Sequence, residues 1–292
     1  MKIITPFLLI TLMLLSPFCL AQRDFSEVNI KIIPVQDSIY MLMGSGGNIG
    51  VSIGEDGVFM IDDEFAPLSE KITAAIRTLS DKPIRFLANT HFHGDHTGGN
   101  AKFQEAGAII IAQENVRKRL KNDNNVEGLP VITFDSSLTL HLNGNDIMAT
   151  HVHNAHTDSD ALIYFPQSNV MHAGDTFFAN GFPFIDLKSS GSIAGDIEAG
   201  QAGLMLANAD TKIIPGHGNL TTYADYKSYV EMLKTLRENV QKAINNGKKR
   251  TEISAMESLS SDFYTDAEAE KSFINGPKIR ETIYDSLTSK ME

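Results

Sequence analysis

The chain has 292 residues, a formal net charge of −11 at pH 7 and 42% hydrophobic residues. This length and apolar content are sufficient for a folded domain with a sizeable core. The acidic charge argues against nucleic acid or an anionic membrane as a partner.

Residues 1–21 are predicted to be a secretory signal peptide. Lys2 is the only charged residue before Arg23, and an apolar stretch from Ile3 to Leu20 separates it from the small residue Ala21. This order is typical of a signal peptide that is cut after Ala21. We therefore expect a periplasmic or secreted protein.

A membrane anchor and a lipidated cysteine are the alternatives to a signal peptide. Polar residues and Pro17 interrupt an apolar run that is already short for a bilayer, which disfavours an anchor. Cys19 is the only cysteine, and the residues before it are a poor match for lipidation. Cleavage after Ala21 would leave no membrane contact and no thiol. That excludes a disulfide, a cysteine nucleophile and a cysteine metal ligand.

Residues 22–218 show short apolar runs that alternate with helical spacing, which is typical of an α/β domain. Strand-like runs occupy 39–43, 49–53, 58–61, 84–88 and 212–214, with several more within 131–171. Helical spacing occurs at 68–79 and 197–209. Glycine, asparagine and proline separate the runs, for example in the loop 44–48.

The sequence changes character after Asn219. Residues 222–246 have the spacing of a long amphipathic helix, and Gly247 and a basic patch at 248–250 follow it. Further helical stretches continue to the end of the chain. We predict that 219–292 form a helical extension packed on the domain formed by 22–218.

Four potential metal ligands follow the predicted strand 84–88 within six positions: His91, His93, Asp95 and His96. On a loop, His91 and His93 can point one way while Asp95 and His96 point the other. Imidazole nitrogens and carboxylate oxygens are preferred zinc ligands, so this arrangement suits two adjacent zinc ions. The sequence therefore predicts a two-metal site at the end of this strand.

Three further motifs follow in order along the chain. They are His156 in the small-residue turn 155–159, Asp175 in Gly-Asp-Thr, and His217 in Pro-Gly-His. With these motifs and its H-x-H-x-D-H segment, the chain resembles the metallo-β-lactamase superfamily over nearly all of its expected mature length. The resemblance implies a four-layer αββα sandwich with a helical C-terminal extension.

The resemblance also implies a ligand set for two zinc ions per chain. His91, His93 and His156 would hold the first ion, Asp95, His96 and His217 the second, and Asp175 would bridge them. The two ions would activate a water molecule for attack on a carbonyl. Asp95 would have a second role, because it would orient this water or carry its proton.

Several residues near these motifs are candidates for supporting roles. Asp62, at the end of a predicted strand, and Thr90, beside His91, are possible hydrogen-bond partners of the ligand histidines. A plain loop carboxylate is an equal alternative for Asp62. The remaining histidines have other expected roles: His153 supports a ligand, His151 is structural or exposed, His172 is packed near the site and His141 is solvated.

Departures from the family pattern bear on the substrate. The lactamase group with a cysteine ligand is excluded, and Phe178 stands where that group places a substrate-binding lysine. A bridging aspartate is shared with glyoxalase II and acyl-homoserine lactonases. The aromatic loop 177–192 resembles one in exported, poorly characterised members. It is expected to form a wall of the pocket, with Lys188 as a possible carboxylate contact, although some phenylalanines would pack beneath the next helix.

The combined interpretation is an exported di-zinc hydrolase of a small-molecule substrate, with a β-lactam as the most specific expectation. A lactone, ester or thioester hydrolase is the alternative. A second alternative, from another class of enzyme, is a mono-iron persulfide dioxygenase of the same superfamily. A zinc-storing protein is disfavoured, because structural zinc sites are closed to further ligands. The oligomeric state is left open.

Overall fold

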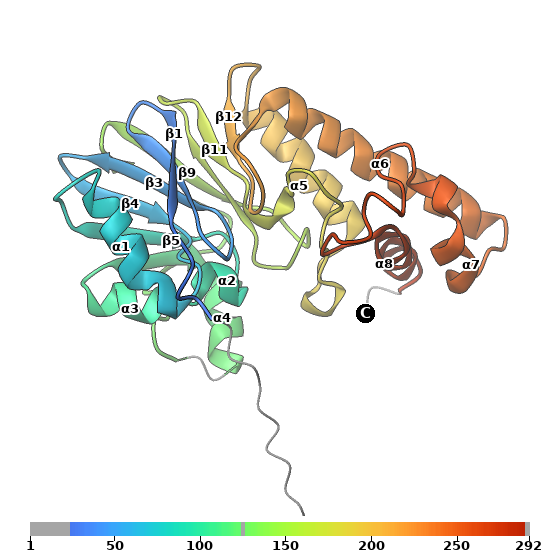
Figure 1. Cartoon of the computed structure of the whole chain (residues 1–292), viewed down its shortest axis with the longest axis horizontal. Helices are drawn as coiled ribbons and strands as arrows, with labels where there is room; N and C mark the ends of the chain where they lie inside the picture. Colours follow the sequence, from blue (N-terminus) through green and yellow to red (C-terminus); the bar gives the residue numbers. More distant parts are fainter. Residues whose placement is uncertain (1–23, 124–125, 290–292) are drawn as a thin grey trace, which may run out of the picture.

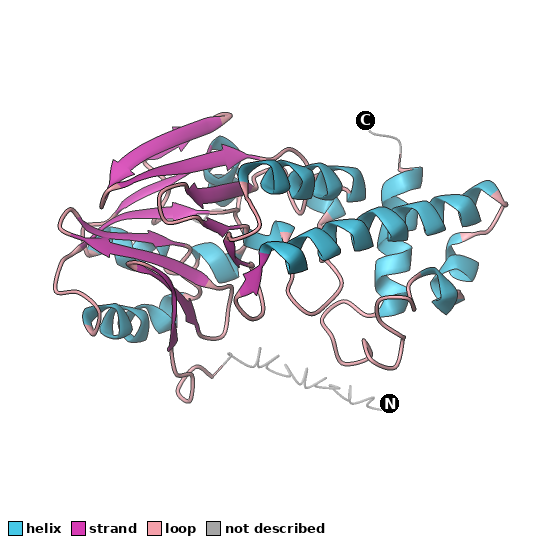
Figure 2. Ribbon diagram, turned by 90° about the horizontal axis from the view of Figure 1, so that it is seen from above, coloured by secondary structure: helices cyan, strands magenta, loops and turns pink. Residues whose placement is uncertain are grey.

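The computed structural model describes residues 24–123 and 126–289, so the expected signal peptide and Cys19 lie outside the described part of the chain. Two β-sheets lie face to face, and helices cover the outer face of each (Figure 1 and Figure 2). The predicted four-layer αββα sandwich with a helical C-terminal region is therefore confirmed. Among the described residues, no helix has both the length and the apolar character to cross a bilayer.

The first sheet contains seven strands that lie side by side in chain order. They are β1 (Lys31–Gln36), β2 (Ile39–Met43), β3 (Ile49–Gly54), β4 (Gly57–Ile61), β5 (Ile84–Asn89), β6 (Ile109–Gln113) and β7 (Ile132–Phe134). Strands β1 to β4 pair antiparallel, whereas β4 to β7 pair parallel. Because parallel strands end at the same edge of a sheet, the loops after β4 and β5 lie next to each other there.

The second sheet contains six strands in the order β13-β12-β11-β10-β9-β8. They are β8 (Ser137–Leu142), β9 (Asn145–His151), β10 (Ala161–Phe165), β11 (Val170–His172), β12 (Lys212–Ile214) and β13 (Thr221–Thr222). Only the β11–β12 pair is parallel. The loops after β11 and β12 therefore emerge at one edge.

Alternating side chains of the strands divide the core into layers. Phe59 and Ile61 of β4 pack between the sheets, whereas Val58 and Met60 pack on the outer face, where α1 (Ser69–Arg77) contributes to the same cluster. All five residues of β4 are buried, which explains its continuous apolar sequence. The other elements of this half are η1 (Ala66–Leu68), α2 (Gly94–Thr97), α3 (Asn100–Glu105) and α4 (Glu114–Asn122).

The second sheet is covered by α5 (Ile193–Leu206) and α6 (Tyr223–Asn245), which follow the short η2 (Gly174–Thr176) and η3 (Leu187–Ser189). Helix α5 begins earlier and ends earlier than the predicted 197–209. The Ser192 side chain accepts a hydrogen bond from the Gly195 amide and so sets the start of the helix. At the other end, Ala207 is extended and stops it. Residues on several sides of this apolar helix are buried, so its sequence shows only a weak alternation of polar and apolar faces.

The C-terminal region contains α7 (Arg250–Ala255), η4 (Glu257–Leu259) and α8 (Gly276–Thr288), which lie at the far end of α6 (Figure 1). One apolar cluster continues from Leu162 of β10 through Leu236 of α6 to Ile283 of α8. Arg280 of α8 is fully buried, and its guanidinium donates to the Ser254 carbonyl, the Ser260 hydroxyl and both carboxylate oxygens of Asp266. This one side chain connects helix α7 to the segments around Ser260 and Asp266.

Candidate metal centre

All seven predicted ligands lie on loops or short helices at one edge of the sandwich. His91 and His93 follow β5, Asp95 and His96 lie on α2, His156 lies between β9 and β10, Asp175 lies on η2 after β11, and His217 follows β12. The first four residues come from the first sheet and the last three from the second. The structure therefore brings together residues that are up to 126 positions apart, from His91 to His217.

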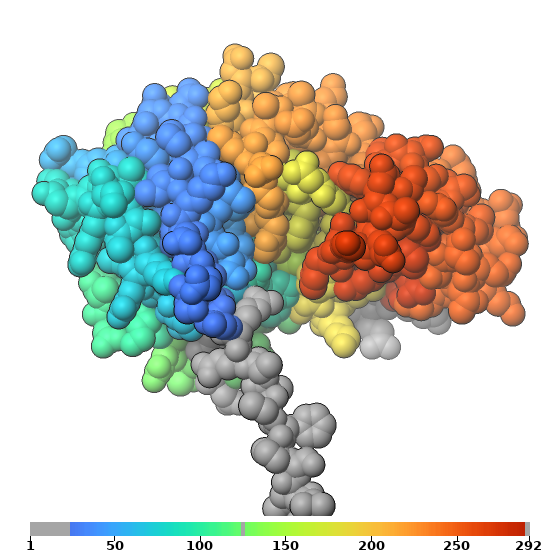
Figure 3. Space-filling model, in the orientation of Figure 1, coloured from blue at the N-terminus to red at the C-terminus, as the bar shows by residue number. Residues whose placement is uncertain are grey.

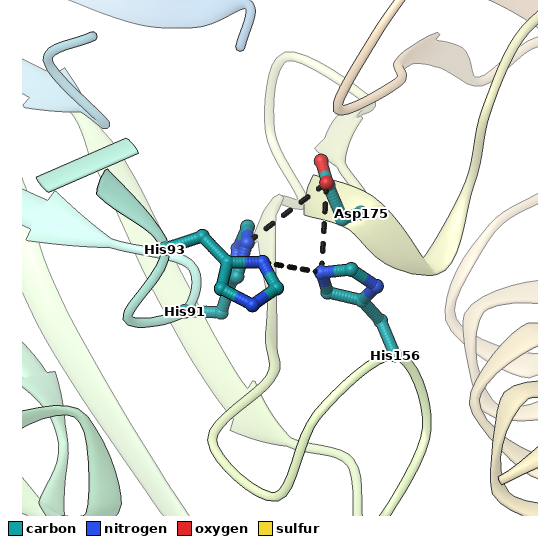
Figure 4. Close-up of side chains that lie close together, drawn as sticks. All are labelled: His91, His93, His156 and Asp175. Carbon is teal, nitrogen blue, oxygen red and sulfur yellow. Dashed lines mark hydrogen bonds and ion pairs between the residues drawn. The ribbon is translucent and has the colours of Figure 1, made fainter. Parts of the chain in front are cut away.

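The first group of ligand atoms comes from His91, His93, His156 and Asp175, and these atoms lie within 4.8 Å of one another. Figure 4 shows the four side chains pointing toward a common point. His156 Nε2 lies 2.9 Å from His93 Nδ1 and 3.6 Å from Asp175 Oδ2, and His91 Nε2 lies 3.9 Å from the same oxygen. Three imidazole nitrogens thus converge with one carboxylate oxygen.

The second group comes from Asp95, His96 and His217, whose ligand atoms also lie within 4.8 Å of one another. His217 Nε2 and His96 Nε2 lie 3.4 and 3.9 Å from Asp95 Oδ2. Asp175 contacts this group as well, because its Oδ1 lies 3.1 Å from His96 Nε2 and its Oδ2 lies 3.4 Å from His217 Nε2. Asp175 therefore stands between the two groups.

Buried atoms without partners test whether these residues fit a metal. His91 Nε2, His96 Nε2 and Asp175 Oδ1 are buried and make no hydrogen bond to any described residue. His96 Nε2 and Asp175 Oδ1 lie 3.1 Å apart, but they are not aligned for a hydrogen bond to each other. An unpaired buried polar atom costs about 1–3 kcal/mol, so three of them converging in one place require an explanation. Imidazole nitrogen and carboxylate oxygen are the donors that zinc prefers, and the residues fit such ions.

Two histidines of the first group, His91 and His156, are neutral at ordinary pH. Burial lowers the pKa of His156 to about 4, and it lowers the pKa of His91 well below its usual value, with the charge of His96 adding to the effect. A neutral imidazole has a free nitrogen lone pair. Both side chains are therefore ready to donate to a metal without first losing a proton.

The second group concentrates negative charge. Burial alone would lower the pKa of His217, but the charge of Asp175 and hydrogen bonds to Asp175 and Asp95 raise it to about 9. For His96, the charges of Asp175 and Asp62 likewise overcome burial and raise the pKa. Burial would raise the pKa of Asp95, yet the hydrogen bond from His217 brings it to about 2. The carboxylates thus favour positive charge at this position, which a dication would also supply.

Asp62 connects the two groups, because it contacts His96 directly and His91 through Thr90. Its carboxylate accepts hydrogen bonds from the Thr90 amide and hydroxyl, both at 2.7 Å, and lies 2.8 Å from His96 Nδ1. The Thr90 oxygen in turn lies 3.1 Å from His91 Nδ1. The Asp62 backbone has a φ of 60°, an unusual conformation for a residue other than glycine. Of the two interpretations of Asp62, the structure supports the one in which it supports the ligands.

Two supporting contacts were not predicted from the sequence, and both come from the aromatic loop. Asp186 Oδ2 lies 3.2 Å from His93 Nε2, and the Phe184 carbonyl lies 2.6 Å from His156 Nδ1. Each contact orients an imidazole so that its other nitrogen faces the site. Asp186 is 93 positions from His93 and belongs to no recognisable motif, so no sequence signal marked it.

Two glycines leave space for ligand side chains. A Cβ at Gly47 would lie about 2.1 Å from the His96 ring, and one at Gly216 would lie about 2.0 Å from Asp175 Oδ1. Neither position accepts a side chain without displacing a predicted ligand. Between them, Asn48 donates from its amide nitrogen to the carbonyls of Pro215 and Gly218 and so holds the loop that carries His217.

The other histidines lie outside the two groups. His172 is buried next to the site, with Nε2 3.0 Å from the Asn48 carbonyl, as expected for a packed residue. His141 has a 77% exposed side chain and contacts Asp146, also as expected. His151 is buried against the Asp160 carbonyl. His153 is exposed and its ring contacts His151, so the described contacts give it no supporting role at a ligand.

The aromatic loop 177–192 forms one wall of the site and also packs beneath α5. Phe184 stacks on the His93 ring at 5.9 Å, and Phe178 stacks on the His217 ring at 5.4 Å. Phe177 and Phe182 are instead buried in the cluster that contains α5. Both expectations for this loop are confirmed. Lys188 is exposed on η3.

Comparison with known proteins places this geometry in a family. The model of the Metallo-beta-lactamase superfamily matches residues 44–234. A linear primary-alkylsulfatase from a Pseudomonas strain is 33% identical over 88 residues, which are 28% of this chain and only 16% of that enzyme. Metallo-beta-lactamase IND-1 of Chryseobacterium indologenes is 23% identical over 171 residues, or 55% of this chain and 69% of that protein.

Solved structures share the fold. The crystal structure of DIM-1 metallo-beta-lactamase superposes with a TM-score of 0.63 at 20% sequence identity, and the match covers 72% of this chain and 99% of that one. At this identity the likeness establishes architecture alone. The family match spans every predicted ligand, and each of them lies at the same edge of the sandwich. The chain therefore belongs to the metallo-β-lactamase superfamily.

Proposed function

We propose that this protein is a di-zinc hydrolase in which an activated water attacks a substrate carbonyl. The observation that carries this proposal is the position of Asp175. Its two oxygens face both groups of ligand atoms, and one of them is buried without a hydrogen-bond partner. A carboxylate shared in this way suits two adjacent cations better than one.

The side chains divide the chemical work between them. Two zinc ions held here would lower the pKa of a water toward neutrality and polarise the carbonyl of the substrate. Asp95 has a 30% exposed side chain and is ionised at neutral pH, since its pKa is about 2. Its carboxylate can therefore accept a hydrogen bond from the attacking water and orient it. The stacked ring of Phe184 shields His93 from solvent on the side of the aromatic loop.

A β-lactam is the most specific substrate that we propose. Two of the similar proteins, IND-1 and DIM-1, are named metallo-beta-lactamases, which supports this choice. An ester, thioester or lactone is the alternative, and a specific observation favours it. Asp175 occupies the Gly-Asp-Thr position that the chain shares with glyoxalase II and the lactonases, and the one cysteine of the sequence, Cys19, lies in the proposed signal peptide.

The test combines metal analysis with a small substrate panel. The chain from Gln22 onward is purified, its zinc and iron contents are measured, and a chromogenic β-lactam, an acyl-homoserine lactone and a glutathione thioester are assayed. We expect two zinc ions per chain and lactam hydrolysis that His93→Ala abolishes. The matched control is His141→Ala, because His141 is exposed and lies in neither group of ligands.

The other outcomes separate the alternatives. Two zinc ions with cleavage of the lactone or thioester, but not of the lactam, would assign the protein to the ester branch. One iron per chain would contradict the hydrolase proposal. Export is tested separately by N-terminal sequencing of protein recovered from the periplasm or the medium. The proposed cleavage after Ala21 requires Gln22 as the first residue.

A further inference from the structure

An aromatic pair extends from the metal centre to the C-terminal region. Phe184 of the aromatic loop stacks on the His93 ring and packs edge-on against the His156 ring, with centroids 5.9 and 5.4 Å apart. Phe273 packs edge-on against Phe184, at 5.4 Å and 83°. Phe273 lies just before α8, in a part of the chain beyond the family match at 44–234. In Figure 1 the aromatic loop, in yellow, passes beside the red C-terminal region, and in the space-filling view of Figure 3 yellow and red surfaces adjoin.

A lysine lies above this aromatic pair. The Nζ atom of Lys278 is 4.8 Å from the Phe273 ring centroid and 5.7 Å from that of Phe184. Lys278 is exposed and occupies the first turn of α8, three residues after the N-cap Asn275. A positive charge at this end of a helix opposes the helix dipole, so the charge of Lys278 does not stabilise α8 through that dipole.

Arg119, a cation close to His93, is neutralised by a carboxylate, whereas Lys278 is not. The Arg119 guanidinium lies over the Phe92 ring at 4.9 Å, and that ring contacts His93. Both Asp158 oxygens accept hydrogen bonds from Arg119, at 2.6 and 2.8 Å. Within residues 24–123 and 126–289, by contrast, no carboxylate lies within 4.0 Å of Lys278 Nζ. Lys278 therefore retains a charge that can pair with a ligand.

Phe273 is unusually exposed for a phenylalanine. It has 74% of its surface accessible, although one edge of its ring contacts Phe184. An exposed aromatic side chain next to a functional site offers apolar surface that a ligand can bury. The two centroid distances from Phe184 place Lys278 Nζ within about 12 Å of the His93 ring. One small molecule can span this distance.

We propose that Phe184, Phe273 and Lys278 form a recognition site for the part of the substrate that does not react. The aromatic pair binds an apolar group, and the Lys278 ammonium pairs with an anionic group while the scissile carbonyl lies at the metal centre. The substrate class is then a small apolar molecule that carries a carboxylate or a similar anion. This inference rests on the proposed function and gives the C-terminal helices a role in specificity.

Binding of unreactive probes tests the recognition site directly. Benzylsuccinate carries an aromatic ring and two carboxylates, one for the metal centre and one for Lys278, whereas phenylpropionate carries the ring and only one carboxylate. Calorimetry on the zinc-loaded protein compares the two probes. We expect Lys278→Ala to weaken benzylsuccinate binding about fivefold and phenylpropionate binding less than about twofold. Phe273→Ser should weaken both probes.

Controls and contrary outcomes keep the inference separate from the hydrolase proposal. Lys271→Ala removes the same charge from an exposed site in the same region and should change neither affinity, and Lys278→Arg should restore the preference for benzylsuccinate. Equal effects of Lys278→Ala on both probes, or no effect, would overturn the inference, as would failure of the unaltered protein to bind benzylsuccinate more tightly. If the zinc-loaded protein hydrolyses no member of the substrate panel while Lys278→Ala still discriminates between the probes, the proposed function fails and the recognition site stands.

Discussion

The loops that carry the predicted ligands and the C-terminal region meet at the same site but are held in place differently. In the loops, short contacts link the ligands to Asp62, Thr90 and Asp186, and glycines allow close approach. In the C-terminal region, the buried guanidinium of Arg280 connects helix α7 to the segments around Ser260 and Asp266, while Phe273 and Lys278, which contact Phe184, are exposed.

This difference indicates how each region can vary. A substitution among the ligands disturbs several neighbours at once, because most of their polar atoms are committed to one another. Phe273 and Lys278 can change without loss of the framework that presents them, since Arg280 maintains that framework independently. Under the two proposals, the chemistry would depend on the ligand loops and the substrate preference on the C-terminal region, which are structurally separate parts.

Replacing the shared carboxylate should have the largest effect. Asp175→Ala removes the carboxylate whose oxygens contact ligand atoms of both groups, so hydrolytic activity should fall by about a thousandfold or more. The zinc content should fall with it. Steady-state kinetics and metal analysis provide the measurement, with the exposed Asp146→Ala as control. Activity within tenfold of the unaltered protein would show that the two groups do not act together.

Breaking the ion pair of the buried Arg280 in the C-terminal region should cost stability and spare the metal centre. Asp266→Asn leaves the fully buried Arg280 without its counterion, so the free energy of unfolding should decrease by about 3 kcal/mol. Denaturant unfolding measures this decrease, and zinc content should remain unchanged. A proportional loss of zinc would show that the two regions are not separate in the way described.

The same pair gives stability a pH dependence of known sign. The hydrogen bond from Arg280 lowers the pKa of Asp266 below its ordinary value of 3.8. The stabilisation is therefore fully present above that ordinary value and is lost as the pH falls through the lowered pKa. In Asp266→Asn this acid-sensitive contribution should be absent.

Loss of the carboxylate behind the ligands should have an intermediate effect. Asp62→Asn removes the charge that orients His96 and supports Thr90, so zinc affinity should fall about 10- to 100-fold. Competition with a chromogenic chelator measures the affinity. The exposed Asp56→Asn changes the net charge equally and serves as the control. An unchanged affinity would identify Asp62 as structural only.

The smallest effect is expected at Asp186. Its carboxylate is 17% exposed and contacts only His93 among the ligands. Burial raises the pKa of Asp186, but hydrogen bonds from Ser189 and His93 lower it overall, so the group is ionised at neutral pH. Asp186→Asn should weaken zinc binding by a few-fold, about the lower limit for such supporting contacts. A loss as large as that for Asp62→Asn would contradict this order.

The sequence identified the residues that converge at the candidate metal centre better than it identified their surroundings. Four of the predicted ligands lie within the six positions from His91 to His96, and Asp175 and His217 each stand in a compact motif, so local spacing carried the signal. Alternation and apolar runs likewise identified β2 to β5. The contact of Asp186 with His93 and that of Phe273 with Phe184 join positions about ninety residues apart. Such contacts depend on how the layers pack, which no local pattern records.

Each group of ligand atoms draws on both sheets of the sandwich. His91 and His93 face His156 and Asp175, while Asp95 and His96 face His217. An ion in either group would therefore act as a cross-link between the two sheets, in a chain whose expected mature form has no cysteine for a disulfide. Because a ligand that binds only the folded state stabilises it in proportion to the logarithm of its concentration, the supply of metal would set both the activity and the lifetime of the fold.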